Sequence, residues 1–201
     1  MKHPVTRFKS LKLALKKLEP FIRNGRHLES GKQFDKFGGM RSREILANWL
    51  LCVAVNYADE KRLTFYSDPI GGDGIIHDED TEETWPTEHV MVTRRQTGEA
   101  EALILQAIEQ KRQKGGEAYA RGKTLVVFFD SDDPEWYPNK VGKQLPTPLL
   151  FTAVWVVGLQ RATLDEYIYN VVSLDLSDSP APVFYVRIPK DFDSWQVIRK
   201  Q

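Results

Sequence analysis

The chain has 201 residues, of which 41% are hydrophobic and 11% aromatic, enough for the core of one domain or of one domain with an appendage. A single cysteine excludes a disulfide framework and a cysteine-based zinc cluster. The first 17 residues carry lysine and arginine throughout, without the apolar run of a secretory signal, and the longest apolar runs, about ten residues each, are too short to span a bilayer. We therefore expect a soluble cytoplasmic protein without a membrane segment.

Charge is spread unevenly along the chain, although the formal net charge is zero. Residues 1–43 contain 12 Lys and Arg against 3 Asp and Glu, a net charge of +9, which leaves −9 for the remainder. A basic segment on an acidic body suggests contact with a polyanion, and a solvated basic helix is the alternative. The candidate nucleic-acid contacts in this segment are Lys12, Lys16, Lys17, Arg41 and Arg43.

The N-terminal part of the chain predicts a basic helix followed by a linker. Residues 6–23 place apolar side chains among lysines at helical spacing and end at Asn-Gly. Residues 24–40 are polar and rich in glycine, as linkers are. We therefore expect a boundary between an N-terminal helix and linker, residues 1–41, and an α/β domain, residues 42–201.

The rest of the chain alternates predicted strands and helices. Apolar alternation and apolar runs predict strands over residues 62–67, 74–77, 87–93, 123–129, 166–176 and 182–188. Helical spacing predicts helices over residues 43–57, 99–114 and 147–160. Ser42 is expected to cap the first of these helices. The third range suits a helix or a strand, and its initial prolines and its length favour a helix. This order predicts an α/β fold, with a central mixed β-sheet flanked by helices.

Two carboxylates occupy positions that need an explanation. Asp73 lies in a glycine-rich turn, where most such residues are structural. Glu88 alternates with Val90 and Val92, so it lies at the rim of an apolar strand face, where a carboxylate needs a partner. A divalent cation shared with Asp73 would be such a partner, and an ion pair with a basic side chain is the alternative.

The helix predicted after this strand carries a lysine in its apolar face. Stepping 100° per residue places Lys111 among the apolar side chains of residues 99–114. Glu88 is roughly 16 Å back from the end of its strand, a distance that a returning helix covers in about eleven residues. We therefore expect Lys111 near Glu88, where it could orient or activate a water molecule. The alternative is a lysine that extends from the helix end into solvent.

The other candidates for metal or nucleophilic chemistry are weaker. No zinc-type spacing surrounds His77 or His89, and we interpret His89 as packed or solvated. Cys52 lies in an apolar helix, so we interpret it as a core residue. The glycines around Asp73 match neither of the common phosphate-binding motifs.

The order helix, three strands, helix, strand, with an Asp in "GDG" before one strand and a Glu in the next, resembles the PD-(D/E)XK nuclease superfamily. The resemblance covers roughly residues 42–130 and implies a restriction-endonuclease-like fold. It implies that Asp73 and Glu88 bind Mg²⁺ or Mn²⁺ and that Glu44 is the acid contributed by the first helix. Val90 stands where the motif has its lysine, and Lys111 would replace that lysine from the following helix.

The sequence therefore predicts a metal-dependent endonuclease that hydrolyses DNA phosphodiester bonds, with the basic segment on the DNA backbone. RNA as the substrate and a homodimer as the assembly stay open. The alternative is a catalytically inactive nuclease-like fold that acts as a nucleic-acid or protein interaction module. Such a module would use the basic segment and the proline-rich loop 134–148, which carries Trp136 and Tyr137.

Overall fold

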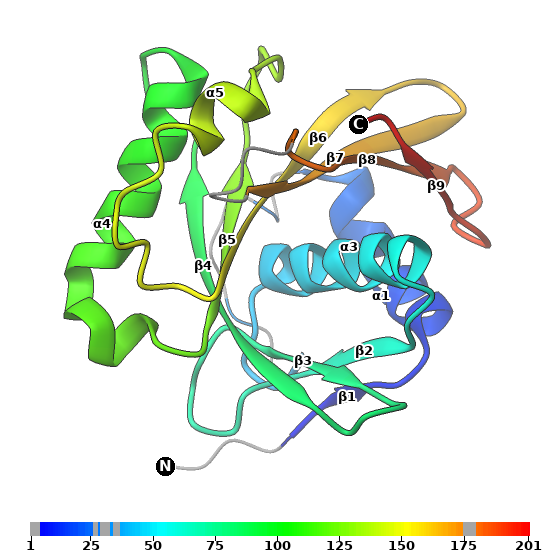
Figure 1. The fold of residues 1–201 in the computed structure, drawn as a ribbon. Coiled ribbons are helices and arrows are strands. Elements are labelled where there is room, and N and C mark those ends of the chain that lie inside the picture. The colour runs from blue at the N-terminus through cyan, green and yellow to red at the C-terminus, as the bar shows by residue number, and fades with distance from the viewer. Residues whose placement is uncertain (1–4, 26–27, 29–32, 34–36, 175–179) are drawn as a thin grey trace.

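The computed structural model describes residues 5–25, 28, 33, 37–174 and 180–201, and it has a mixed α/β fold (Figure 1). Its helices are α1 (Leu11–Arg23), α3 (Ser42–Ala58), α4 (Ala100–Ala120) and α5 (Pro138–Gly142). Its strands are β1 (Arg7–Phe8), β2 (Leu63–Tyr66), β3 (Ile75–Asp78), β4 (Thr84–Val92), β5 (Thr124–Phe129), β6 (Ala153–Ala162), β7 (Glu166–Leu174), β8 (Val183–Pro189) and β9 (Gln196–Arg199). The strands form one mixed sheet in chain order, so the predicted central mixed sheet flanked by helices is confirmed.

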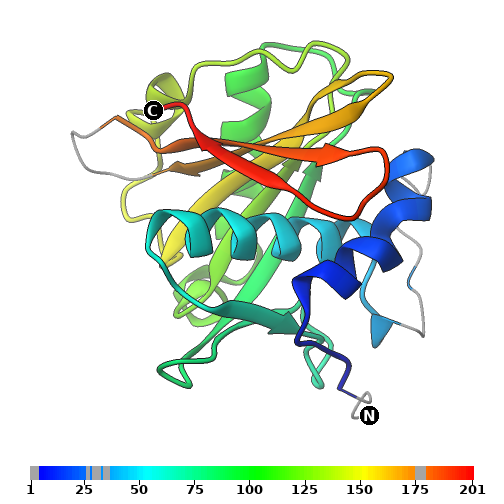
Figure 2. The same ribbon diagram turned by 90° about the vertical axis from the view of Figure 1, so that its right-hand side faces the viewer.

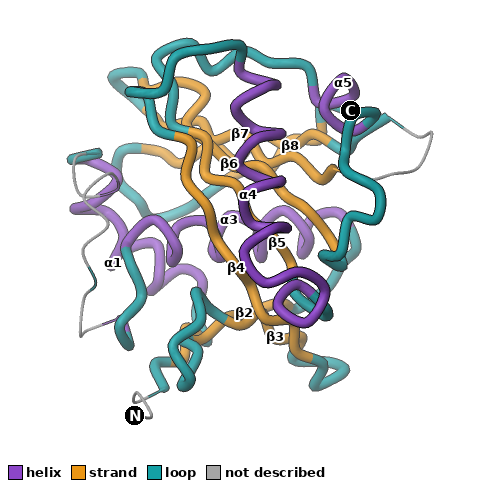
Figure 3. Tube along the Cα trace, turned by 90° about the vertical axis from the view of Figure 1, so that its left-hand side faces the viewer, coloured by secondary structure: helices purple, strands orange, loops and turns teal. Residues whose placement is uncertain are grey.

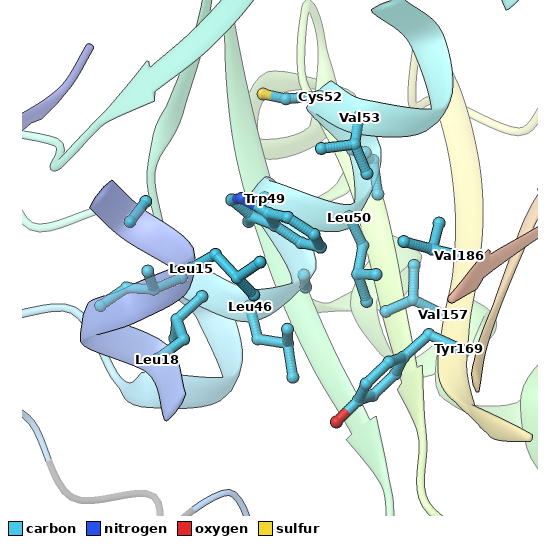
Figure 4. Close-up of a cluster of buried hydrophobic side chains, with 14 of the residues drawn as sticks. Leu15, Leu18, Leu46, Trp49, Leu50, Cys52, Val53, Val157, Tyr169 and Val186 are labelled. Atoms are coloured by element: carbon cyan, nitrogen blue, oxygen red, sulfur yellow. The ribbon is translucent and has the colours of Figure 1, made fainter. Parts of the chain in front are cut away.

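The sheet curls around helix α3, which is apolar on all sides. Strands β2 and β3 lie below this helix and β7 to β9 above it, while α1 packs beside it (Figures 1 and 2). Its side chains Leu46, Trp49 and Leu50 are fully buried. Leu15 and Leu18 of α1 point into the same cluster (Figure 4). A helix that is apolar all round requires such a cover, because each of its faces must be removed from water.

A second hydrophobic cluster lies on the outer face of the sheet, under α4. This helix lies over β4 and β5 (Figure 3), with Ile104 and Ile108 buried against Val127. Strand β5 pairs in parallel with both β4 and β6. It is buried on both faces, as its continuous apolar run predicts. Within the described ranges, no helix has both the length and the apolar character needed to cross a membrane.

Several predicted boundaries differ from those of the structure. The predicted helix over 147–160 is wrong, because residues 153–162 form strand β6 beside β5. Helix α4 continues to Ala120, past the predicted end at residue 114, with a kink at Gly116. Helix α3 begins with Arg41 as its N-cap in place of Ser42, because Glu44 accepts from the Arg41 backbone N–H at 2.8 Å.

The N-terminal segment shares its core with the rest of the chain. Strand β1 pairs with β2, and α1 contributes to the cluster around α3. Ser10 caps α1 by accepting from the backbone N–H of Leu13. Residues 26–27, 29–32 and 34–36 of the predicted linker lie outside the described residues.

Candidate active site

The pairing of β3 with β4 brings Asp73 and Glu88 together. Ile75 pairs with Pro86 in antiparallel register, and continuing this register by two residues places Asp73 opposite Glu88. The turn is fixed to β4, because the backbone N–H of His89 donates to Asp73 Oδ2 at 2.7 Å. The sequence hypothesis that these two carboxylates act as neighbours therefore has a geometric basis in the strand pairing.

Gly74 allows the chain to approach helix α3 closely at this turn. Its φ is +137°, and a Cβ there would lie 2.3 Å from Asn48 Nδ2. Asn48 donates from that nitrogen to the backbone carbonyl of Asp73 at 3.2 Å. The glycine next to Asp73 is thus required by its backbone conformation and by its contact with α3.

Glu88 lies between two lysines. Lys111 Nζ is 2.5 Å from Glu88 Oε1, and Lys123 Nζ is 3.7 Å from Glu88 Oε2. The Glu88 side chain is 9% exposed, and that of Lys111 is 15% exposed. The prediction that Lys111 points from its helix to Glu88 is confirmed. The ion pair that the sequence left open as the alternative partner of Glu88 is present as well.

Tyr119 completes this side of the site. The Lys123 ammonium lies 4.1 Å from the centre of its ring, and the Lys114 ammonium lies 5.0 Å from it. Burial, a hydrogen bond with Glu88 and the charges of Glu88 and Asp73 raise the pKa of Tyr119 well above its ordinary value. The phenol therefore stays protonated, with the Glu88 carboxylate close to it.

The N-terminus of α3 forms the opposite side of the site. Glu44 is buried and accepts from Arg41 Nη1 at 2.6 Å. Burial, together with the nearby charge of Asp73, raises the pKa of Glu44. The charge of Asp73 also acts on the guanidinium groups of Arg41 and Arg43. Of the five predicted nucleic-acid contacts, these two arginines lie at the start of α3, where Arg41 pairs with Glu44.

His89 is buried in the interior, where it contacts Asn48. Its Nε2 lies 3.1 Å from Asn48 Oδ1 in the interior, and since the Asn48 nitrogen donates to Asp73, the Asn48 oxygen accepts from His89. Burial lowers the pKa of His89 to about 3, so the imidazole is neutral. The interpretation of His89 as a packed residue is confirmed, and so is that of Cys52, which is fully buried.

The predicted contacts on α1 are placed elsewhere. Lys16 pairs with Asp193, in the turn between β8 and β9, at 2.9 Å, and it donates to the Asp191 carbonyl at 2.7 Å. The hydrogen bond from Lys16 and the charge of Lys12 lower the pKa of Asp193. Lys17 lies 5.9 Å from the ring of Phe8. Helix α1 thus directs Lys16 to the β8–β9 turn.

Sequence reasoning missed two groups of the site, Lys123 and Tyr119. Both follow the kink at Gly116, whose φ of +58° and ψ of −151° redirect the chain toward the start of β5. The available signal was the position of Lys123 directly before a buried strand that pairs with the strand of Glu88.

In the described part of the chain, no three His, Cys, Asp or Glu side chains converge as a group that could hold a metal ion. When the chain is compared with protein-family models, with curated proteins and with solved structures, nothing matches it.

Proposed function

We propose that the chain is a metal-dependent nuclease that hydrolyses DNA phosphodiester bonds, with a fold of the restriction-endonuclease-like kind. The observation that carries the proposal is the placement of Glu88: Asp73 accepts from the backbone N–H of the next residue, His89, and the ammonium groups of Lys111 and Lys123 lie 2.5 and 3.7 Å from the Glu88 carboxylate. Two carboxylates with adjacent cations are the groups that phosphodiester hydrolysis needs, because charge must be neutralised and a water molecule oriented.

The donor set of this site is compatible with Mg²⁺ or Mn²⁺. Asp73 and Glu88 offer carboxylate oxygens, the ligand type that these ions prefer. Since no group of three metal-ligating side chains is found among the described residues, the protein would supply these two carboxylates. That number fits Mg²⁺, which is usually held by one or two carboxylates together with water and substrate phosphates. Such an ion would supply Lewis-acid polarisation of the phosphate and a lowered pKa of a bound water.

The residues around the pair then have separate roles. The hydroxide derived from water forms a new bond to phosphorus, one phosphoester bond breaks, and the departing oxygen takes up the remaining proton. Lys111 and Lys123 stabilise the negative charge that develops on the phosphoryl oxygens and orient the water. Tyr119, protonated and close to Glu88, can donate to its carboxylate and help to orient it. Arg41 and Arg43, at the N-terminal end of α3, can contact a flanking phosphate.

A catalytically inactive interaction module is the second candidate, and one observation favours it. The two lysines already balance the charge of Glu88, and Val90 stands at the motif position of the lysine. A purely structural ion pair would have the same appearance. The two candidates differ in their response to metal, since only the nuclease requires Mg²⁺ or Mn²⁺ at Asp73.

The test is cleavage of plasmid DNA and of single-stranded DNA by the purified full chain with Mg²⁺, Mn²⁺ or EDTA. We expect cleavage with either metal and none with EDTA. Asp73→Asn and Glu88→Gln keep the size of each side chain, and the amide oxygen introduced by Asp73→Asn can still accept from the His89 backbone N–H, so both variants should fold. Each should lower the cleavage rate at least about a hundredfold, the scale of a lost charge-stabilising group.

Glu117→Gln is the matched control. It removes an exposed carboxylate of α4, the helix of Lys111, and this carboxylate pairs with Arg121. This variant should cleave at the rate of the parent chain when purified in the same way. Cleavage by Glu88→Gln at the parental rate would assign the activity to a contaminant and refute the nuclease. Absence of cleavage by the parent, together with absence of Asp73-dependent Mn²⁺ binding in calorimetry, would support the interaction module.

A further inference from the structure

Strands β1 to β4 pair in antiparallel fashion, and one of their two faces continues the face of β4 that carries Glu88. Residues directly opposite each other in paired strands share a face, and residues two apart in one strand do so as well. Arg7 pairs with Tyr66, Tyr66 with Ile75, and Ile75 with Pro86, which lies two residues before Glu88. These side chains therefore form a row across four strands on the Glu88 face.

The other face of the same strands is closed. The neighbouring row consists of Phe8, Phe65, Ile76 and Trp85, and the first three of these are buried in the core around α3. On the outer face, α4 packs against β4 and β5, while β2 and β3 lie beyond its C-terminal end (Figure 3). The Glu88 site is thus at the border between the part of the face that α4 covers and the part that stays open.

The open part of this face is hollowed. A hollow of about 500 Å³ is lined by side chains from β1 to β4 and from the β3–β4 turn. Its two ends differ in charge: Arg7 and Lys9 stand at the β1 end, and Glu79 and Glu82 stand at the turn. Between them, Tyr66 and His77 present their rings in an edge-on contact at 6.3 Å.

The acidic end of the hollow carries a cation of its own, Arg62, and the basic end has no carboxylate partner among the described residues. Arg62 pairs with Glu79 and with Asp80, each at 3.1 Å. Arg7 and Lys9 are exposed, and in the described part of the chain neither forms an ion pair. Among the described residues, the positive charge of this face that no carboxylate compensates therefore lies at the β1 end.

We infer that this outer face, with Arg7 and Lys9 of the β1 segment, binds the phosphodiester backbone of the nucleic acid that enters the Glu88 site. The inference rests on the proposed nuclease function and specifies which part of the basic N-terminal segment contacts the substrate. Three strand spacings separate β4 from β1, roughly 14 Å, which matches about four nucleotides at a rise of about 3.4 Å each. Helix α1 is not the proposed contact, because its Lys16 pairs with Asp193 in the β8–β9 turn at 2.9 Å.

The experiment measures binding apart from cleavage. Glu88→Gln serves as the parent, and anisotropy of a short fluorescent DNA duplex, and of the corresponding single strand, is followed at several salt concentrations without divalent metal. Arg7→Gln/Lys9→Gln removes two charges from the β1 segment, and Lys12→Gln/Lys16→Gln removes two from α1. We expect the first pair to weaken binding at least about tenfold and to lower the slope of log K against log salt by about 2, as the loss of two phosphate contacts does.

The α1 pair is expected to keep the parental slope, and Arg7→Lys/Lys9→Arg should restore binding because charge alone carries backbone contacts. Circular dichroism of each variant checks that β1 still pairs. Equal losses from both glutamine pairs, or no binding by the parent, would overturn the inference. A parent that binds through β1 while the wild-type chain never cleaves would refute the nuclease and leave the binding face standing, so the two failures are distinguishable.

Discussion

Glu88 is the buried carboxylate that pairs with both lysines of the candidate site, Lys111 and Lys123. Lys111→Met leaves Glu88 with Lys123 alone at 3.7 Å. We expect a loss of about 2 kcal/mol in the free energy of unfolding, below the roughly 3–5 kcal/mol for a buried charge left without a partner. Glu88→Gln/Lys111→Met should recover part of this loss, since the buried carboxylate is then gone and the remaining cation, Lys123, has a side chain that is 30% exposed to water. Urea unfolding of the single and double variants gives the coupling energy, and simple additivity would show that the pair contributes nothing to stability.

The sequence identifies single residues of the site where a periodic element fixes them. Glu88 follows from strand alternation and Lys111 from the 100° step of a helix, and both positions agree with the structure. Lys123 and Tyr119 lie beyond the kink at Gly116, where no period connects them to the preceding helix. The partner of Asp73 is equally non-local, because the contact with Asn48 depends on how α3 packs against a turn 25 residues away.

At the scale of elements, β6 and β9 show where pattern reasoning fails. Residues 153–162 form a strand because Val154, Trp155, Val156 and Val157 are β-branched or aromatic and fit a pleated sheet. The prolines before them favour a helix start only when the next residues are helical, and here they belong to the loop that leads into β6. Strand β9 has four residues at the sheet edge, too few for alternation to identify it.

Gly158 of β6 lies close to the backbone of β5, and a substitution at this glycine tests the contact between the two strands. A Cβ at Gly158 would lie 2.3 Å from the carbonyl oxygen of Phe129, which is backbone and cannot rotate away. Gly158→Ala should therefore lower the free energy of unfolding by about 1–3 kcal/mol, the usual cost of overpacking. Gly25→Ala is the control, since its Cβ would meet no atom within 4 Å. Thermal melting compares the two, and equal midpoints would show that β5 and β6 can separate at Gly158 without cost.

At the scale of the whole molecule, one helix organises the packing. The sheet turns around α3, so β2, β7, β8 and β9 are far apart in the sequence and all contact the same helix. The sequence indicates this arrangement in part, because a helix with apolar side chains on every face must be enclosed. The number of strands that enclose it, and the place of β1 beside β2, depend on long-range pairing that local pattern does not encode.

A substitution that creates a cavity in α1 tests whether residues 1–41 are a unit separate from the α/β domain. Leu18 is fully buried against the α3 cluster, whereas Leu13 of the same helix is 65% exposed. Leu18→Ala should lower the free energy of unfolding by about 2–5 kcal/mol, while Leu13→Ala should change it by less than about 0.5 kcal/mol. Because α1 and α3 share one core, tryptophan fluorescence and far-ultraviolet circular dichroism should report a single shifted urea transition for Leu18→Ala. An early separate transition, with the main midpoint unchanged, would instead show that residues 1–41 unfold as an independent appendage.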